Sequence, residues 1–168
     1  MMNTQLLTKD QINSIVSIIK EQCEKYSNLH YMAQELYYAP YSKMRRQHDI
    51  TGAVLSAFKP NGYKIPGLSI EKVEYGRKNT FAQPEFKNEN VVFHIVSHHN
   101  GLNSNFYLEK CKEYNSLPET KPTYALIIFL TTREGHLKKI DFAIPNDQGK
   151  IIASTTLYED KTPIIKIA

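Results

Sequence analysis

Residues 124–130 of this 168-residue chain read Tyr-Ala-Leu-Ile-Ile-Phe-Leu, the most apolar segment of the sequence. A short, continuous apolar run is typical of a strand that is buried on both faces. We therefore expect residues 124–130 to form the central strand of a sheet. Residues 91–96 form a second such run, broken only by His94, and predict another buried strand.

The segments around the central run predict one helix and an antiparallel meander. Residues 103–115 carry apolar side chains at helical spacing, which fits a helix of about three turns. Residues 137–144 alternate like a half-buried strand, and a turn signal at 145–149 precedes a strand at 151–157. Residues 162–167 are expected to add an edge strand. An exposed last strand is able to pair two copies of the chain, so we expect a monomer or a homodimer.

The N-terminal part is expected to be helical. Thr8 and Gln11 form a capping-box pattern before a predicted helix at 9–25. The pair Ser27 and Asn28 predicts a break, followed by a short helix at 29–36 that ends before Pro40.

The pattern changes from helical to extended after residue 48. Residues 50–58 are rich in small and branched side chains and predict the first strand, which Pro60-Asn61-Gly62 ends. Residues 68–75 predict the next strand, with a bulge or bend between Ile70 and Val73 because the alternation slips there.

These elements together predict an α+β fold in one compact domain covering residues 1–168. N-terminal helices (residues 1–48) would pack on a mostly antiparallel mixed sheet of about six strands (residues 49–168), and we expect all helices to lie on one face of it. One helix would be inserted between the third and fourth strands. No apolar run approaches the roughly 20 residues that span a bilayer, and the N-terminus lacks the pattern of a secretory signal. We expect a cytoplasmic protein with no membrane partner, and Cys23 and Cys111 as small apolar fillers of helix faces.

Positive charge is concentrated in residues 36–80. This segment carries eight Lys and Arg against three acids, a balance of +5, whereas the whole chain carries +4. Tyrosine and phenylalanine rings lie among these cations, and such a combination suits a phosphate backbone with stackable bases. The expected binding residues are Lys43, Arg45, Arg46, Lys59, Lys64, Arg77 and Lys78 for phosphates and Tyr41, Tyr63 and Tyr75 for stacking or hydrogen bonds. The plainer alternative is a charged face that only contacts solvent, beside tyrosines whose rings pack in the core and whose hydroxyls reach water.

Glu85-Phe86-Lys87 suggests a nuclease as an alternative. It lies where a helix, three strands and a helix are expected in sequence, and this order resembles the core of the PD-(D/E)xK nucleases. In that family carboxylates hold Mg²⁺ while a lysine helps to position the attacking water. The resemblance implies that Glu85 and Lys87 match the second half of the motif, with Glu71, Glu74 or Asp49 as the missing acid. The sequence has no Pro-Asp pair upstream, and Gln83-Pro84 predicts a loop at Glu85.

Histidines offer a further set of candidates. His48 with Arg45 and Arg46 has the groups of a metal-independent ribonuclease, namely an acid or base and charge stabilisation. His94, His98 and His99 lie within six residues. For these we expect one buried, hydrogen-bonded histidine and two exposed ones at a strand end, with no metal site.

The interpretation we favour is a small non-enzymatic binding protein that engages nucleic acid or a nucleoprotein complex and uses no cofactor. Lysine outnumbers arginine 17 to 4, as in AT-rich genomes, and a lone domain of this kind is typical of a phage or mobile-element inhibitor of a host defence system. A nuclease is the enzymatic alternative. A protein-protein inhibitor that recognises an acidic protein surface is the third, because the same cations would serve it.

Overall fold

A computed structural model describes most of the chain, and the account below is confined to that part. The backbone is described at residues 6–37, 43–59, 61–75, 81–98, 105–116, 122–132 and 134–162. Side chains are described at residues 6–28, 50–59, 61–71, 83–98, 107–116, 122–132 and 134–162.

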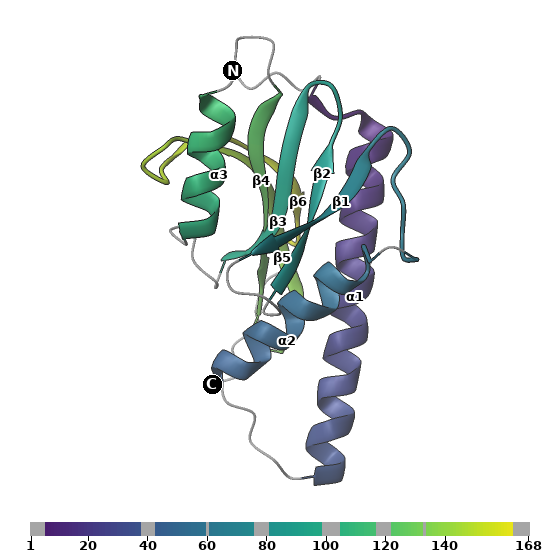
Figure 1. Ribbon diagram of the computed structural model, residues 1–168. Coiled ribbons are helices and arrows are strands. Elements are labelled where there is room, and N and C mark those ends of the chain that lie inside the picture. The colour runs from purple at the N-terminus through teal and green to yellow at the C-terminus, as the bar shows by residue number, and fades with distance from the viewer. Residues whose placement is uncertain are drawn as a thin grey trace.

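The described residues form three helices and six strands, as Figure 1 shows. In chain order they are α1 (Lys9–Tyr37), α2 (Lys43–Ser56), β1 (Ser69–Tyr75), β2 (Phe81–Lys87), β3 (Val91–Ser97), α3 (Asn105–Asn115), β4 (Thr123–Thr131), β5 (Leu137–Pro145) and β6 (Ile151–Glu159). The α+β fold class is confirmed, and so is the helix inserted between the third and fourth strands.

The six strands lie side by side in chain order. Of the described pairs, only β3 and β4 run parallel, and α3 lies in the long connection that a parallel pair requires. The other four pairs are antiparallel, so the predicted meander β4–β5–β6 is confirmed. β3 is buried along its whole length and β4 nearly so, which confirms both as central strands.

Helices cover both faces of the sheet (Figure 1). α1 and α2 share one hydrophobic core with side chains of β3, β4 and β5 such as Phe93, Phe129 and Ile140. α3 shares a second core with the opposite face, which includes Val96 and Leu126. The expectation that all helices lie on one face is therefore wrong. Both faces of β4 are apolar, and both need a cover that excludes water.

α1 is a single helix of 29 residues, so the predicted break at Ser27 and Asn28 is wrong. Ser27 lies well inside the bounds of α1, and its side chain is buried. Serine and asparagine disfavour a helix only slightly, and the packing of the apolar stripe outweighs that preference. The capping box is confirmed: the Thr8 amide donates to Gln11 Oε1 at 2.9 Å, and the Gln11 amide donates to Thr8 Oγ1 at 3.1 Å.

The strand predicted at residues 50–58 is also wrong, because residues 50–56 form the second half of α2. Ile50, Val54 and Phe58 are buried and stand four residues apart, which is a helical spacing. The helical N-terminal part therefore extends to Ser56, beyond the expected boundary at residue 48.

The structure contains a strand that the sequence did not predict. Residues 81–87 form β2, although Pro84 suggested a loop. Only Phe86 and Lys87 of β2 pair with β3, so Pro84 lies where no amide hydrogen is needed on that side. β1 pairs with β2 without a register shift from Ser69 to Tyr75, so the predicted bulge in β1 is wrong.

The remaining expectations concern single elements. The helix predicted at 103–115 and the strands predicted at 137–144 and 151–157 are confirmed as α3, β5 and β6. Cys23 and Cys111 are buried, as expected. The predicted edge strand lies almost entirely outside the described residues. None of the described helices has the length and apolar character needed to cross a bilayer.

Candidate functional site

Hydrogen bonds within the loop that joins α2 to β1 hold its described residues, 57–59 and 61–68, in place. The Gly62 amide donates to the Lys59 carbonyl at 2.7 Å, and the Tyr63 amide donates to the Ala57 carbonyl at 2.8 Å. A Cβ atom at Gly62 would lie 2.2 Å from the Ala57 oxygen, so this tight turn requires glycine.

Two contacts with α1 fix the α2–β1 loop against the body of the protein. Gln11 Nε2 donates to the Pro66 carbonyl at 3.1 Å, and the Tyr63 hydroxyl donates to Glu21 Oε2 at 2.8 Å. Ile65, between them, is buried in the core of α1 and α2. These contacts hold the second half of the loop against α1 before any partner binds.

The outer side of this loop presents cations and one aromatic ring. Lys59 and Lys64 are exposed and make no ion pair with another described residue. Tyr63, which directly precedes Lys64 in the chain, is 41% exposed. Glu21 is the acid that touches this loop, and Lys25 neutralises it at 3.1 Å. The hydrogen bond from Tyr63, followed by that from Lys25, lowers the pKa of Glu21, which therefore stays ionised and paired.

A cavity of about 450 Å³ opens between this loop and α1. Its lining combines a cation, a phenol ring, a hydroxyl and two carboxamides, contributed by Gln22, Ser56, Lys59, Asn61, Gly62 and Tyr63.

Of the ten predicted binding side chains, Lys59, Tyr63 and Lys64 belong to this loop, and Lys59 and Tyr63 line the same cavity. Lys43, Arg45 and Arg46 lie at the other end of α2 by their backbone, together with the ribonuclease candidate His48. The two ends of this 14-residue helix are roughly 20 Å apart. Tyr75 ends β1, but its side chain is outside the described part. Tyr41, Arg77 and Lys78 also lie outside the described residues.

The nuclease candidates lie on two neighbouring strands. The loop predicted at Glu85 is wrong, because Glu85 and Lys87 lie in β2, the second of the three strands before α3. Glu71 of β1 pairs directly with Glu85, so both side chains share one face, and Lys87 lies on that same face. Glu71 and Lys87 are exposed, whereas Glu85 is buried. Glu74 and Asp49 are placed only by their backbones, in β1 and α2.

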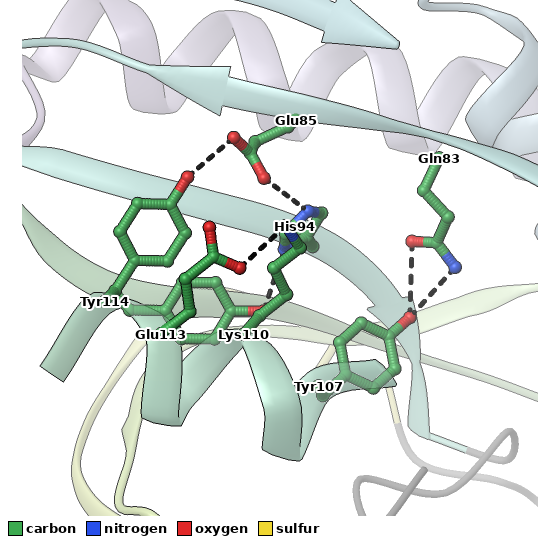
Figure 2. A network of polar contacts seen from close by, with 8 residues as sticks. Gln83, Glu85, His94, Tyr107, Lys110, Glu113 and Tyr114 are labelled. Atoms are coloured by element: carbon green, nitrogen blue, oxygen red, sulfur yellow. Dashed lines mark hydrogen bonds and ion pairs between the residues drawn. The ribbon is translucent and has the colours of Figure 1, made fainter. Parts of the chain in front are cut away.

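Glu85 belongs to a buried polar network that Figure 2 shows. The Tyr114 hydroxyl donates to Glu85 Oε1 at 2.8 Å, and Glu85 Oε2 lies 3.2 Å from His94 Nε2. The second contact has the distance of an ion pair but not the angles of a hydrogen bond. His94 Nδ1 lies 2.8 Å from the Tyr124 hydroxyl. The network joins β2, β3, β4 and α3 at the point where β2 and β3 stop pairing.

A second pair of polar groups lies beside this chain of contacts. Gln83 Nε2 donates to the Tyr107 hydroxyl at 3.2 Å, which again ties β2 to α3 (Figure 2). Lys110 Nζ contacts Glu113 at 3.1 Å near the surface of α3. The Gln83–Tyr107 contact therefore attaches α3 to the sheet, whereas the Lys110–Glu113 contact lies within α3.

The electrostatics of the network favour an ionised Glu85. Burial alone would raise the pKa of this carboxyl group, but the interaction with His94 and the hydrogen bond from Tyr114 outweigh burial and lower it. Burial raises the pKa of the Tyr114 and Tyr124 hydroxyls, so both remain neutral. Tyr114, Tyr124 and His94 are all buried, and the arrangement therefore suits a structural role better than contact with a substrate.

Sequence reasoning identified part of this network and missed the rest. The expected buried, hydrogen-bonded histidine is confirmed as His94, and His98 is exposed as expected, while His99 lies outside the described residues. Tyr107, Tyr114 and Tyr124 were not among the predicted site residues. A usable signal was present, since a buried tyrosine needs a partner for its hydroxyl and a histidine in an apolar strand needs one for its ring.

The described part of the chain contains no group of three or more His, Cys, Asp or Glu side chains arranged to hold a metal ion. No protein-family model, curated protein or solved structure matches the chain. Any functional conclusion therefore depends on the geometry above.

Proposed function

We propose that this chain is a non-enzymatic protein that binds nucleic acid, alone or in a nucleoprotein complex, through the α2–β1 loop. The observation that carries the proposal is a hydrogen-bonded loop that carries exposed Lys59, Tyr63 and Lys64, with no ion pair from either lysine to another described residue. Because the loop is already ordered, a partner need not supply the free energy to order it. Cations and a ring at one surface match phosphates and bases.

The position of α2 supports the same proposal. Its far end carries Lys43, Arg45 and Arg46 in the first turns. In a B-form duplex, with 3.4 Å per nucleotide of one strand, a separation of roughly 20 Å corresponds to about six phosphates. A nucleic acid along α2 would pass the backbone positions of these three residues at one end and Lys59 at the other. We place this activity in the cytoplasm and suggest a phage or mobile-element inhibitor as its biological setting, since a small protein that occupies a nucleic-acid site acts by exclusion.

Reversing the charge of the loop tests the proposal. The variant Lys59→Glu/Lys64→Glu should bind a labelled 12-nucleotide single strand more weakly than the unmodified protein. Its slope of log affinity against log salt should be smaller by about 1.4, the value for two phosphate contacts to a single strand. Fluorescence anisotropy at several salt concentrations measures both quantities.

A matched control separates the loop from overall charge. Lys112→Glu/Lys150→Glu makes the same change in net charge at two exposed lysines of α3 and the β5–β6 turn. The Asn115–Asp147 hydrogen bond joins that turn to α3, far from α1 in Figure 1. Equal behaviour of the two double variants would contradict the proposal. Capture of an acidic protein without any nucleic-acid affinity would instead support a protein-protein inhibitor.

A second candidate, hydrolysis of nucleic acid, is favoured by the pairing of Glu71 with Glu85 and the position of Lys87 on the same face. If this function were correct, labelled RNA or DNA would be cleaved only with Mg²⁺ present, and Glu71→Gln and Lys87→Ala would each abolish cleavage. We expect intact substrates with and without Mg²⁺, because both oxygens of Glu85 are already in contact with Tyr114 and His94. Gel electrophoresis after prolonged incubation measures the outcome.

A further inference from the structure

We infer that the cavity beside the α2–β1 loop receives one unpaired nucleotide of the bound strand. This inference rests on the proposed function and adds the class of ligand, single-stranded rather than double-stranded nucleic acid. The cavity volume of about 450 Å³ falls within the usual range for small-molecule sites, roughly 300–1,000 Å³.

The cavity lining provides groups that suit the phosphate and the base of a nucleotide. Lys59 supplies an ammonium group for the phosphate, and the ring of Tyr63 supplies a surface on which a base can stack. Gln22 and Asn61 each carry a carboxamide with one acceptor and two donor hydrogens. Such groups can hydrogen-bond to the edge of a base once that base is unpaired.

The charge around the cavity favours a phosphate. Glu21 would repel an anion, but Lys25 and the Tyr63 hydroxyl already bind its carboxylate. The C-terminal end of α2 also faces this region, and free helix carbonyls would be unfavourable to an anion. The carbonyls of Val54, Leu55 and Ser56 accept hydrogen bonds of 3.2–3.3 Å from the amides three residues later. Lys59 therefore remains the uncompensated charge among the described side chains of the lining.

The ring of Tyr63 explains why the nucleotide must be unpaired. In a duplex each base is covered on both faces by its neighbours, so a protein ring can stack only on a base that has left the helix. The hydrogen bond from the hydroxyl to Glu21 holds the ring in place. A fixed ring loses little side-chain entropy when a base stacks on it.

Two substitutions at Tyr63 test this inference. Tyr63→Leu removes the ring, whereas Tyr63→Phe keeps the ring and removes the hydroxyl that binds Glu21. We expect Tyr63→Leu to weaken single-strand binding by about 5- to 100-fold, the range for the loss of one stacked base. Tyr63→Phe should weaken binding less than Tyr63→Leu does, because it keeps the ring for stacking and loses only the hydroxyl that contacts Glu21. Circular dichroism melting curves verify that both variants fold.

The probes are a 12-nucleotide single-stranded RNA, the DNA of the same sequence, the corresponding duplex, and adenosine monophosphate. Anisotropy should give at least about tenfold tighter binding of one of the single strands than of the duplex, and Tyr63→Leu should leave duplex binding unchanged. The two single strands distinguish RNA from DNA as the source of the nucleotide.

The possible failures are distinguishable. Salt-dependent binding that is equally tight for duplex and single strand, or equal in Tyr63→Leu and Tyr63→Phe, would overturn the inference and leave the proposed function intact. Binding of adenosine monophosphate alone, lost in Tyr63→Leu, would support the cavity as a nucleotide site and contradict the nucleic-acid function. Absence of binding to all four probes would overturn both.

Discussion

Replacing Glu85 by alanine is expected to lower the free energy of unfolding by about 1–3 kcal/mol, the usual cost of leaving buried polar groups without a hydrogen-bond partner. The carboxylate accepts a hydrogen bond from Tyr114 and contacts His94, and all three groups are buried. With alanine at position 85, the Tyr114 hydroxyl and the His94 ring stay buried but lose the carboxylate that they contact. Urea denaturation followed by circular dichroism measures the change.

Glu113→Ala is the matched control for this experiment. Glu113 is an exposed acid of α3 that contacts Lys110 at 3.1 Å, and an exposed pair of this type contributes between 0 and about 1 kcal/mol. A loss of stability in Glu85→Ala no larger than in Glu113→Ala would show that the network does not hold α3 to the sheet.

The same network predicts how stability depends on pH. The pKa of Glu85 in the folded protein lies below its ordinary value of 4.5, so ionisation of this group favours the folded state. That contribution is fully present above the unfolded pKa and is lost as the pH falls through the folded pKa. The stability difference between the unmodified protein and Glu85→Gln should therefore be greatest near neutral pH and shrink below about pH 4.5. A difference that stays constant down to pH 3 would mean that ionisation of Glu85 does not stabilise the fold.

Replacing Asn28 by proline is expected to cost about 3 kcal/mol or more. Asn28 is exposed and lies in the interior of α1. Proline there removes one helical hydrogen bond and its ring clashes with the preceding turn. Far-UV circular dichroism and urea denaturation measure the loss of helix and of stability.

Asn28→Ala gives the matched comparison, because it changes the same exposed side chain without disturbing the backbone. Alanine favours a helix more than asparagine does, so this variant should be as stable as the unmodified protein or slightly more so. If the proline and alanine variants had equal stability, α1 would be interrupted at Ser27 and Asn28, as the sequence pattern suggests.

The elements that sequence reasoning predicted correctly are those whose burial pattern is local. β4 is a continuous apolar run, β5 alternates, and α3 repeats its apolar side chains at helical spacing. In each case the spacing of apolar residues within the segment indicates which of its faces is buried. The fold class followed from the order of these segments.

The wrong predictions share a different cause, which is dependence on a distant partner. Residues 50–56 are helical because α1 provides the surface on which Ile50 and Val54 pack. β2 is a strand because all of its residues pair with β1. The sequence of residues 81–87 alone does not predict that pairing. Propensity is a weak guide wherever tertiary contacts decide the conformation.

The candidate site was predictable to a similar extent. Lys59, Tyr63 and Lys64 are close in sequence, so their grouping on one loop could be anticipated. The contact of Tyr63 with Glu21 spans 42 residues, and that of Tyr114 with Glu85 spans 29. No local pattern contains such pairings, and for this reason the cavity and the polar network emerge only from the three-dimensional structure.

The parallel pairing of β3 with β4 also has a consequence for synthesis of the protein. Every residue of β3 is buried in the finished fold, yet this strand emerges from the ribosome before α3 and β4 do. Until they emerge, the nascent chain exposes an apolar strand with one unpaired edge and one uncovered face. Such species aggregate readily, so a released chain that ends between residues 98 and 122 is expected to depend on chaperones to remain in solution.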